Sequence, residues 1–588
     1  MRSPEELDTV DWASLTHAYG PAEDVPEQVR SLYSDDPEEV DEALYELYGN
    51  VWHQGSVYPA SVEAVPFLAH AAVNARFKPA WVLMLLSEMA AHEAPDGSVE
   101  QRVRAQVAAV VPDLLPCLRD PDRAVRRAAV RVAVAETSPS PQVVEELLRL
   151  LRQDPVAEVR ADALTALART DPDPTALAAR EADALGSGDP VLRREAALLG
   201  LERLGQGPYP PHLVRILAEA EAEADSGEDG FPFPGLGTGD ERVSAVLDTD
   251  ADTALTVARH WIAQGDVAAR GSFRADRIAC DWRDRENDVV ALLVEALPLL
   301  DDPQHLALRL EAIARWLPKA AEPDAALRDT LLRHATGAHE RAATAARLAL
   351  ARCGDDRFLQ QPALRDAETR HLGELLSALT AQDAASLLPE LKDLLRTRRA
   401  PVLVARRLGD WGVHDQELLD LLTEASTGSD ELLGVNAAVA LVRLGGGDPA
   451  EPLELLRRRL ESGKQVHWYL DECGRLADRG LPLVPRIEEL CHSSHSWTRM
   501  AAAEAHWRIT GDPARATPIL VALADATPVG LRALLALAEI GVTIPEQLRP
   551  RLRHWAFSPR RLLATHWPPD LPHPDDQLRD TCLQLLSR

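Results

Sequence analysis

A ten-residue motif that recurs at a nearly constant spacing constrains this chain more than any other feature. The sequence DPDRAVRRAA occupies residues 120–129, and DPVAEVRADA follows at residues 154–163. A shortened copy, DPVLRREAA, occupies residues 189–197. The copies begin 34 and 35 residues apart, a period that is typical of stacked helical hairpins. Each hairpin in such an array buries its apolar side against the next one, so 588 residues need not form separate globular domains.

The composition of each copy predicts helices. Aspartate accepts hydrogen bonds from the first free N–H groups of a helix, and proline fits the first helical position, so each Asp-Pro pair is expected to open one. Alanine-rich stretches with Leu and Val three or four residues apart indicate closely packed helical faces. Weaker copies, each with a glycine just after its helix, lie within residues 341–355, 437–449, 498–513 and 531–541. Almost no segment alternates with period two, so the sequence predicts an all-α solenoid.

The motif resembles the HEAT repeat, in particular the shorter bacterial HEAT-like type found in actinobacterial and phycobilisome lyase-like proteins. The resemblance is clear over residues 100–205 and fainter over residues 300–545. It implies an α-solenoid of HEAT-like helical hairpins, and it implies no particular activity. It also implies a structural ladder of carboxylates and guanidiniums along the array, formed by Asp120, Arg126, Asp154, Arg160, Asp189 and Arg499.

Charge and cysteine content restrict the possible partners and the compartment. The chain has 63 Lys+Arg and 93 Asp+Glu, a formal net charge of −30. Binding to phosphate backbones or anionic membranes requires clustered basic residues, so nucleic acid is an unlikely partner and a membrane is not expected. The six cysteines are widely spaced, and the acidic N-terminus lacks the pattern of a secretory leader. We therefore expect a cytoplasmic protein.

Four segments differ in pattern and predict the domain organisation. Residues 1–99 form an acidic helical cap, because the first 50 residues carry 14 acidic and 2 basic side chains. Residues 100–220 hold the regular repeats, and residues 253–588 hold degenerate repeats with a C-terminal cap. Between them, residues 221–252 carry 10 acidic side chains and 1 basic one. This composition, rich in Gly and Pro, predicts a loop or an insertion. Phe231 and Phe233 in this loop are candidate binding residues, since loops of a solenoid often gather on its binding face; a simple spacer is the alternative.

An unusual cluster at residues 48–59, YGNVWHQGSVYP, interrupts the helical pattern. Gly49 and Gly55 are expected to allow positive φ on either side of it. Its candidate binding residues supply an amide pair, an imidazole, an indole and a phenol, and they are Asn50, Trp52, His53, Gln54 and Tyr58. A related Gly-Asn-x-x-His-Gln-Gly segment is part of the actinobacterial resemblance. The cluster predicts either a pocket for a small ligand or a catalytic site, or an irregular corner whose polar side chains bind the backbone.

Motifs that carry chemistry are weak in this sequence. Cys491, His492 and His495 are the one metal candidate, but paired Cys-x-x-Cys spacing is absent and the segment aligns with a repeat corner. No nucleophile elbow, HExxH helix or phosphate-binding loop occurs. Whether the protein is an enzyme therefore stays open, with the sequence favouring a non-catalytic role. We predict no cofactor.

The remaining signals concern partners. Several tryptophans lie in the last fifth of the chain, and five arginines gather near one end: Arg549, Arg551, Arg553, Arg560 and Arg561. These arginines support nucleic-acid binding as a second alternative. The acidic array instead favours a scaffold or adaptor that binds another protein with a basic segment along the solenoid groove, for example an immunity or antitoxin protein that neutralises a basic toxin.

Overall fold

The computed structural model spans Met1–Arg588. It describes all of these residues except 92–96, 136–139, 171–172, 224–231, 234, 356, 359–368, 446–447, 464 and 565–572. The chain forms two compact units, Met1–Gln264 and Gly265–Arg588, called unit 1 and unit 2 below. Each unit is described by itself.

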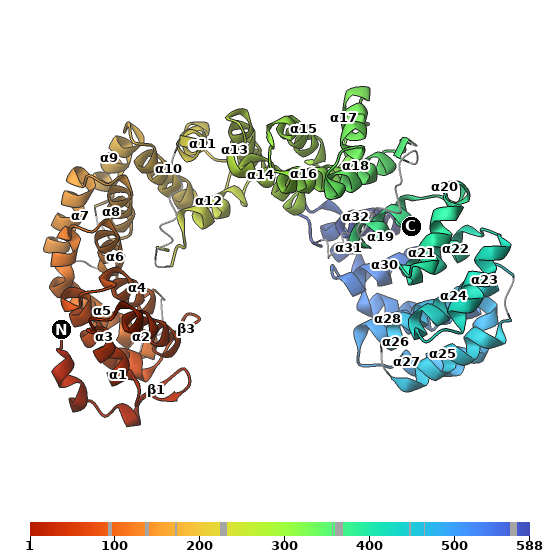
Figure 1. Cartoon of the computed structure of the whole chain (residues 1–588), viewed down its shortest axis with the longest axis horizontal. Helices are drawn as coiled ribbons and strands as arrows, with labels where there is room; N and C mark the ends of the chain where they lie inside the picture. The colour runs from red at the N-terminus through yellow and green to blue at the C-terminus, as the bar shows by residue number, and fades with distance from the viewer. Residues whose placement is uncertain are drawn as a thin grey trace. The chain divides into compact units, whose positions relative to one another are not determined.

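Unit 1 consists of helical hairpins with two small strand pairs near its N-terminus (Figure 1). Its 3-10 helices are η1 Pro4–Thr9, η2 Trp12–Ser14 and η3 Leu115–Arg119. Its strands are β1 Thr16–His17, β2 Gly20–Pro21, β3 Trp52–His53 and β4 Ser56–Val57. Its α-helices are α1 Val25–Ser31, α2 Pro37–Asn50, α3 Pro59–Asn74, α4 Pro79–Met89, α5 Val99–Leu114, α6 Arg123–Ala133, α7 Pro141–Gln153, α8 Ala157–Thr170, α9 Pro174–Leu185, α10 Pro190–Leu204, α11 Pro211–Glu223, α12 Gly239–Leu247 and α13 Ala251–Ala263.

Unit 2 consists of helices joined by turns and loops in its described residues. Its 3-10 helices are η4 Val267–Ala269, η5 Leu297–Leu299, η6 Leu317–Lys319, η8 Ala477–Leu483 and η9 Glu546–Leu548. Its α-helices are α14 Arg270–Asp281, α15 Glu286–Ala296, α16 Pro303–Trp316, α17 Ala325–Ala335, α18 Glu340–Arg352, α19 Thr369–Ala378, α20 Ala381–Ser386, α21 Leu388–Arg396, α22 Pro401–Trp411, α23 Gln416–Ser426, α24 Glu431–Arg443, α25 Ala450–Ser462, α26 Val466–Arg475, α27 Val484–Leu490, α28 Ser496–Thr510, α29 Ala516–Leu523, α30 Pro528–Ile540, α31 Arg549–Phe557 and α32 Pro574–Leu586.

The hairpins stack in series, as the 34-residue period predicts. In unit 1 the two helices of a hairpin pack together, as α7 does with α8, and the second helices α4, α6, α8 and α10 pack one against the next. In unit 2 the corresponding row is formed by α22, α24, α26, α28 and α30. Alanines such as Ala163 and Ala502 are fully buried in these rows, where a small side chain allows close approach of two helices. The prediction of an all-α solenoid is confirmed.

The helix starts within the repeat differ in part from expectation. Asp189 caps α10 by accepting from the backbone N–H groups of Val191 and Leu192, as predicted. In the two earlier copies the helix begins later, at Arg123 and Ala157. Asp122, not Asp120, caps the first of these helices. The prediction that every Asp-Pro pair opens a helix is therefore wrong for two copies, because their aspartates form turns ahead of the helix.

Unit 2 closes on itself in a way that a simple array does not. The segment before α32 returns to the end of α14, where Trp282 and Arg560 form an isolated antiparallel bridge. Arg561 N–H donates to the Asp281 carbonyl at 2.9 Å, and Arg283 N–H donates to the Pro559 carbonyl at 3.0 Å. The end of α14 is therefore joined through backbone hydrogen bonds to the segment that follows α31.

Across the residues that the structure describes, no helix combines the length and apolar content that crossing a bilayer requires.

Candidate binding surfaces

The cluster at residues 48–59 forms a β-hairpin between α2 and α3. Trp52 pairs with Val57 and His53 with Ser56. Gln54 and Gly55 occupy the turn with φ of 49° and 87°, the positive values that a two-residue hairpin turn requires. Gly49 lies inside α2 and has no positive φ, so the expectation for this glycine is wrong and Gln54 takes the left-handed position instead.

Asn50 joins this hairpin to the strand pair β1–β2. It is buried, and its side-chain N–H donates to Asp24 at 3.1 Å. The second oxygen of Asp24 contacts His17 Nε2 at 2.9 Å. The Ala18 N–H donates to the Asn50 carbonyl at 3.1 Å. Asn50 is thus engaged in holding two segments together, which is the behaviour expected of a structural corner.

His53 and Tyr58 also make internal contacts. The Tyr19 hydroxyl lies 3.4 Å from His53 Nδ1, and the two rings meet edge to face at 5.3 Å. Tyr58 precedes α3, and its backbone N–H donates to the Ser61 hydroxyl at 2.8 Å. The structure therefore brings the hairpin residues close together through contacts within the chain.

Trp52 connects the hairpin to a neighbouring surface. Its ring meets the ring of Tyr48 edge to face at 6.0 Å. Its indole N–H is buried and has no acceptor within the described part of the chain. The Tyr48 hydroxyl in turn donates to the Trp81 carbonyl at 3.1 Å. Trp52 thus packs against Tyr48, and Tyr48 lines a groove between α2 and α4.

An open groove of about 320 Å³ lies between α2 and the start of α4, and it is called the aromatic groove below. Its lining residues are Asp41, Leu44, Tyr45, Tyr48, Lys78 and Trp81. Tyr45 is 79% exposed and Trp81 is 48% exposed. Exposed aromatic side chains that lie side by side are among those that contribute most to protein interfaces. Sequence reasoning did not single out Tyr45 or Trp81.

The aromatic groove has acidic surroundings. The Lys78 ammonium forms an ion pair with Asp41 at 2.9 Å, so the one cation that lines the groove is already matched. Along α2, the carboxylates of Glu38, Glu42 and Glu46 are exposed to solvent. A cationic segment would therefore meet aromatic rings in this groove and further carboxylates on the exposed surface of α2.

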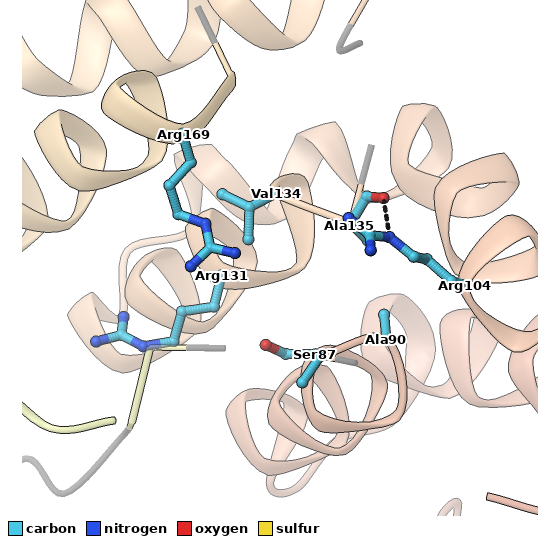
Figure 2. A pocket seen from close by; sticks show the side chains of 8 residues that line it. Ser87, Ala90, Arg104, Arg131, Val134, Ala135 and Arg169 are labelled. Carbon is cyan, nitrogen blue, oxygen red and sulfur yellow. Dashed lines mark hydrogen bonds between the residues drawn. The ribbon is translucent and has the colours of Figure 1, made fainter. Parts of the chain in front are cut away.

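A second, much smaller pocket lies between α4, α6 and α8 (Figure 2). Arg104, Arg131 and Arg169 line it together with Ser87, whose buried hydroxyl has no hydrogen-bond partner among the residues described. Its volume is about 10 Å³, which suits one water molecule. Arg104 donates to the Ala135 carbonyl at 3.5 Å. A pocket of this size holds no organic ligand.

The repeat residues form ion pairs between successive hairpins. Arg126 binds both carboxylate oxygens of Asp154, at 2.8 and 2.9 Å, and donates to the Asp120 carbonyl at 2.9 Å. Arg160 donates to the Asp154 carbonyl at 2.6 Å and to the Asp189 carboxylate at 2.5 Å. Each guanidinium thus links its own corner to the following one.

Arg499 has a related contact in unit 2. Its guanidinium donates to the Ser493 carbonyl at 2.7 Å, six residues earlier in the chain. Arg126 and Arg160 reach back over the same interval to Asp120 and Asp154. Ser493 has no carboxylate, so this corner lacks the acidic side chain that Asp154 and Asp189 supply in the regular repeats.

A second set of buried charges runs between the helices themselves, and sequence reasoning missed it. Asp162 on α8 accepts hydrogen bonds from Arg127 and Arg131 on α6, each at 2.7 Å. Glu195 on α10 accepts from Arg242 on α12 at 2.7 Å. A signal was present, because Asp162 and Glu195 interrupt otherwise apolar, alanine-rich helical faces.

Phe231 and Phe233 were predicted as binding residues, and the structure describes only one of them. Phe231 lies outside the described residues. Phe233 is 4% exposed, and the guanidinium of Arg131 lies 5.4 Å from its ring centre. Arg131 also donates to the Pro232 carbonyl at 3.0 Å. Phe233 is therefore packed against α6 and presents no aromatic surface to a partner.

The metal candidate does not converge. Cys491 is buried, and burial raises the pKa of its thiol to about 11, which disfavours the thiolate that a metal needs. His495 caps α28, since its Nδ1 accepts from the Thr498 N–H. His492 is exposed. No group of three or more His, Cys, Asp and Glu side chains in the described ranges is arranged to hold a metal ion.

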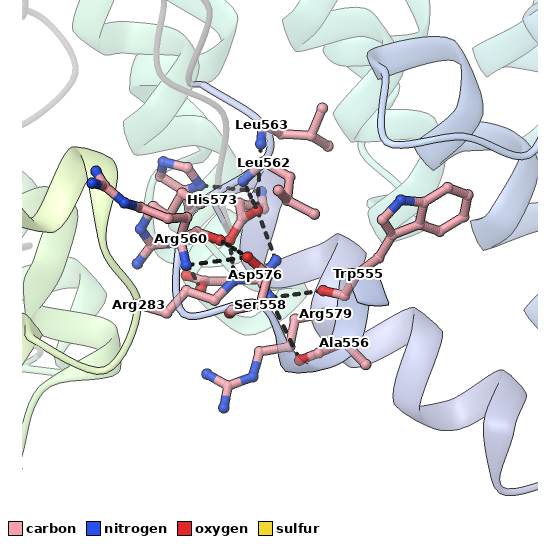
Figure 3. A network of polar contacts seen from close by, with 12 residues as sticks. Arg283, Trp555, Ala556, Ser558, Arg560, Leu562, Leu563, His573, Asp576 and Arg579 are labelled. Carbon is pink, nitrogen blue, oxygen red and sulfur yellow. Dashed lines mark hydrogen bonds and ion pairs between the residues drawn. The ribbon is translucent and has the colours of Figure 1, made fainter. Parts of the chain in front are cut away.

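The C-terminal arginines are largely committed to contacts within unit 2, and Figure 3 shows the surroundings of Arg560. The Arg561 side chain is 1% exposed and binds Asp576 at 2.9 Å. The Arg560 guanidinium lies 3.6 Å from the ring centre of Trp282. Arg551 pairs with Asp525 at 2.9 Å. Most of these charges are matched by carboxylates or aromatic rings of the same unit, so they do not form a continuous basic face for nucleic acid.

Comparisons with known proteins agree with the repeat architecture. Residues 111–202 match the family model of HEAT repeats. A search of curated protein sequences finds no significant match. Among solved structures, Kap121p is 13% identical with a TM-score of 0.44, covering 95% of this chain and 67% of its own.

Two further structures show comparable similarity. Importin Beta is 12% identical with a TM-score of 0.44, covering 96% of this chain and 83% of its own. The S. pombe condensin Cnd3-Cnd2 subcomplex is 15% identical with a TM-score of 0.29, covering 95% of this chain and 80% of its own. TM-scores below 0.5 at these identities carry no information on partners. Residues 111–202 are thus a stretch of HEAT repeats within a longer α-solenoid.

Proposed function

We propose that this protein is a non-catalytic scaffold that binds another protein, and that unit 1 recognises a basic segment of that partner in the aromatic groove. The observation that carries the proposal is the joint exposure of Tyr45 and Trp81, at 79% and 48%, beside the carboxylates of α2. Exposed aromatic rings contribute contact area at a low cost in side-chain entropy.

Charge supports the choice of partner. The first 50 residues carry 14 acidic and 2 basic side chains. Complementary charge accelerates the encounter with a basic partner and disfavours acidic competitors. A basic toxin that is neutralised by the scaffold is one partner with this chemistry, so an immunity or antitoxin role belongs to the same proposal.

We further propose that the protein works in the cytoplasm. Its six cysteines are free, as expected in a reducing compartment. Burial raises the pKa of Cys117 to about 11 and that of Cys280 to about 12, which keeps both thiols protonated at neutral pH.

The test is affinity capture from cells of the native host with the wild-type chain and with the double variant Tyr45→Ala, Trp81→Ala. We expect a partner that the wild-type chain retains at low salt, releases at high salt and loses in the double variant. Trp468→Ala is the matched control, because Trp468 lies in unit 2 and is 47% exposed, close to the value for Trp81. The retained protein is then purified and its binding to the wild-type chain measured directly.

Two results would contradict the proposal. The first is a purified partner that binds the double variant as tightly as the wild-type chain. The second is a binding segment that maps to an acidic or uncharged stretch of the partner. Thermal unfolding of each variant excludes loss of fold as the cause of lost binding.

A further inference from the structure

We infer that Lys78 is an internal occupant of the aromatic groove, and that an arginine of the partner displaces it from Asp41. This inference rests on the proposed function and adds the identity of the recognised side chain. It also makes Lys78 a competitor that weakens binding.

The position of Lys78 supports this role. Lys78 lines the groove with Tyr45, Tyr48 and Trp81, and its ammonium lies 2.9 Å from the Asp41 carboxylate. The two side chains of this ion pair are 38% and 56% exposed. A partner can therefore reach Asp41 without unfolding any helix, and an exposed ion pair of this kind is easily exchanged.

The backbone holds Lys78 and Trp81 in a fixed relation. The Lys78 carbonyl accepts the N–H groups of Trp81 at 3.0 Å and Val82 at 3.2 Å, which starts α4. Lys78 has φ of 55° and ψ of 31°, a left-handed conformation that residues with a Cβ adopt infrequently. The helix start thus keeps a cation and an indole side by side in the same groove.

An arginine fits the groove better than the lysine that occupies it. Asp41 is bound by Lys78 through one oxygen, whereas a guanidinium can donate to both oxygens of a carboxylate. A guanidinium is also planar and weakly hydrated, so it stacks on aromatic rings such as those of Tyr45 and Trp81. The exchange therefore favours arginine over lysine in the partner.

The experiment uses the full chain and three fluorescent nonapeptides in which glycine alternates with arginine, lysine or citrulline. Citrulline keeps the planar shape of arginine and removes its charge. We expect fluorescence anisotropy to show the arginine peptide binding at least three-fold more tightly than the lysine peptide, and the citrulline peptide at least ten-fold more weakly than the arginine peptide. Trp81→Ala should weaken binding of the arginine peptide about ten-fold.

The decisive variant is Lys78→Gln, which removes the competing charge. It should tighten binding of the arginine peptide by about three- to ten-fold. Gln465 occupies the same position at the start of α26, with φ of 48° and ψ of 33°, so glutamine accepts this backbone conformation in this fold. Lys319→Gln is the matched control, because Lys319 pairs with Asp580 at 3.3 Å and is 39% exposed. The control should leave binding unchanged.

The outcomes separate this inference from the proposed function. Lys78→Gln that weakens binding or leaves it unchanged, in a chain that melts like the wild type, overturns the inference. Equal affinity for the arginine and lysine peptides also overturns it. In both cases the proposed function stands if the double variant Tyr45→Ala, Trp81→Ala still loses the captured partner. If that variant keeps the partner, the proposed function fails as well.

Discussion

Arg283 and Asp575 are separated by 292 positions in the sequence and form a bidentate ion pair with distances of 2.6 and 2.8 Å. Their side chains are 1% and 0% exposed. Arg283 also donates to the Trp555 carbonyl at 2.7 Å and to the Ser558 carbonyl at 3.1 Å (Figure 3). Burial acts to raise the pKa of Asp575, but hydrogen bonds from Arg283 and Leu562, together with the charges of Arg283 and Arg561, outweigh it and leave this pKa lowered.

The first prediction concerns this ion pair. Arg283→Met leaves the Asp575 carboxylate buried without its main partner, so the free energy of unfolding of unit 2 should fall by about 3–5 kcal/mol. Arg579→Gln is the control, since Arg579 pairs with Asp284 at the surface, with exposures of 32% and 71%. It should cost less than about 1 kcal/mol. Urea unfolding followed by circular dichroism measures both changes, and equal effects of the two variants would contradict the prediction.

The second prediction concerns pH. Burial lowers the pKa of His573 to about 3, and the nearby Arg561 guanidinium acts in the same direction. The unfolded chain binds a proton at this histidine below about pH 6.5, whereas the folded chain does not until about pH 3. Unit 2 should therefore lose stability as the pH falls through this window, by about 2 kcal/mol between pH 7 and pH 5.

His573→Asn tests this assignment. Asparagine can still cap α32, as His573 does by accepting from the Asp575 N–H, but it does not titrate. The variant also loses the stacking of His573 on Trp316, which lowers stability at every pH. The readout is therefore the difference in unfolding free energy between pH 7 and pH 5. A difference as large in the variant as in the wild type would show that another group titrates.

The third prediction compares two glycines beside the β3–β4 hairpin. Gly49 is helical, and a Cβ built there meets no atom within 4 Å. Gly49→Ala should therefore leave stability unchanged or raise it by about 0.5–1 kcal/mol. Gly55 has φ of 87°, so Gly55→Ala should lower stability by roughly 1–2 kcal/mol. Thermal unfolding of both variants measures the pair, and destabilisation by Gly49→Ala would contradict the helical placement.

The fourth prediction concerns the buried charges between helices in unit 1. Asp162→Ala leaves Arg127 and Arg131 without their shared carboxylate, while their side chains are only 11% and 3% exposed. The free energy of unfolding should fall by about 3–5 kcal/mol. Asp8→Ala is the control, because Asp8 is 81% exposed where it pairs with Arg30, and its loss should be within about 1 kcal/mol. Urea unfolding distinguishes the two, and a small loss for Asp162→Ala would indicate that water reaches the two arginines.

The sequence predicted the fold because the fold is local. A helix start and an alanine-rich face in the regular repeats, and a glycine stop in copies such as those ending at Gly511 and Gly541, all act on near neighbours, and these signals survive in a single sequence. Contacts between distant segments left no such signal. The sequence places Arg561 near other arginines, which suggested an exposed cation, yet its side chain is buried against Asp576. Its burial depends on the return of α32 to α14, which no local pattern records.

The candidate site, too, could be predicted only where the signal was local in the sequence. Unusual local composition pointed to the hairpin at residues 50–58, and the structure shows how Asn50 is held there by Asp24. Tyr45 and Trp81 were not predicted, because each lies in a helix with no unusual local pattern and only tertiary packing places them in one groove. Phe233 was chosen from its loop context, whereas contact with Arg131 buries it.

The return of the last helix to the first ones has a consequence for synthesis on the ribosome. Hairpins of an ordinary repeat array can fold one after another as they emerge, because each needs only its neighbour. The buried arginine near the start of unit 2 has no carboxylate partner until Asp575 has been translated. Unit 2 is therefore expected to reach its native state only after Asp575 has left the ribosome, and chaperones should bind nascent chains that lack α32 for longer than they bind unit 1.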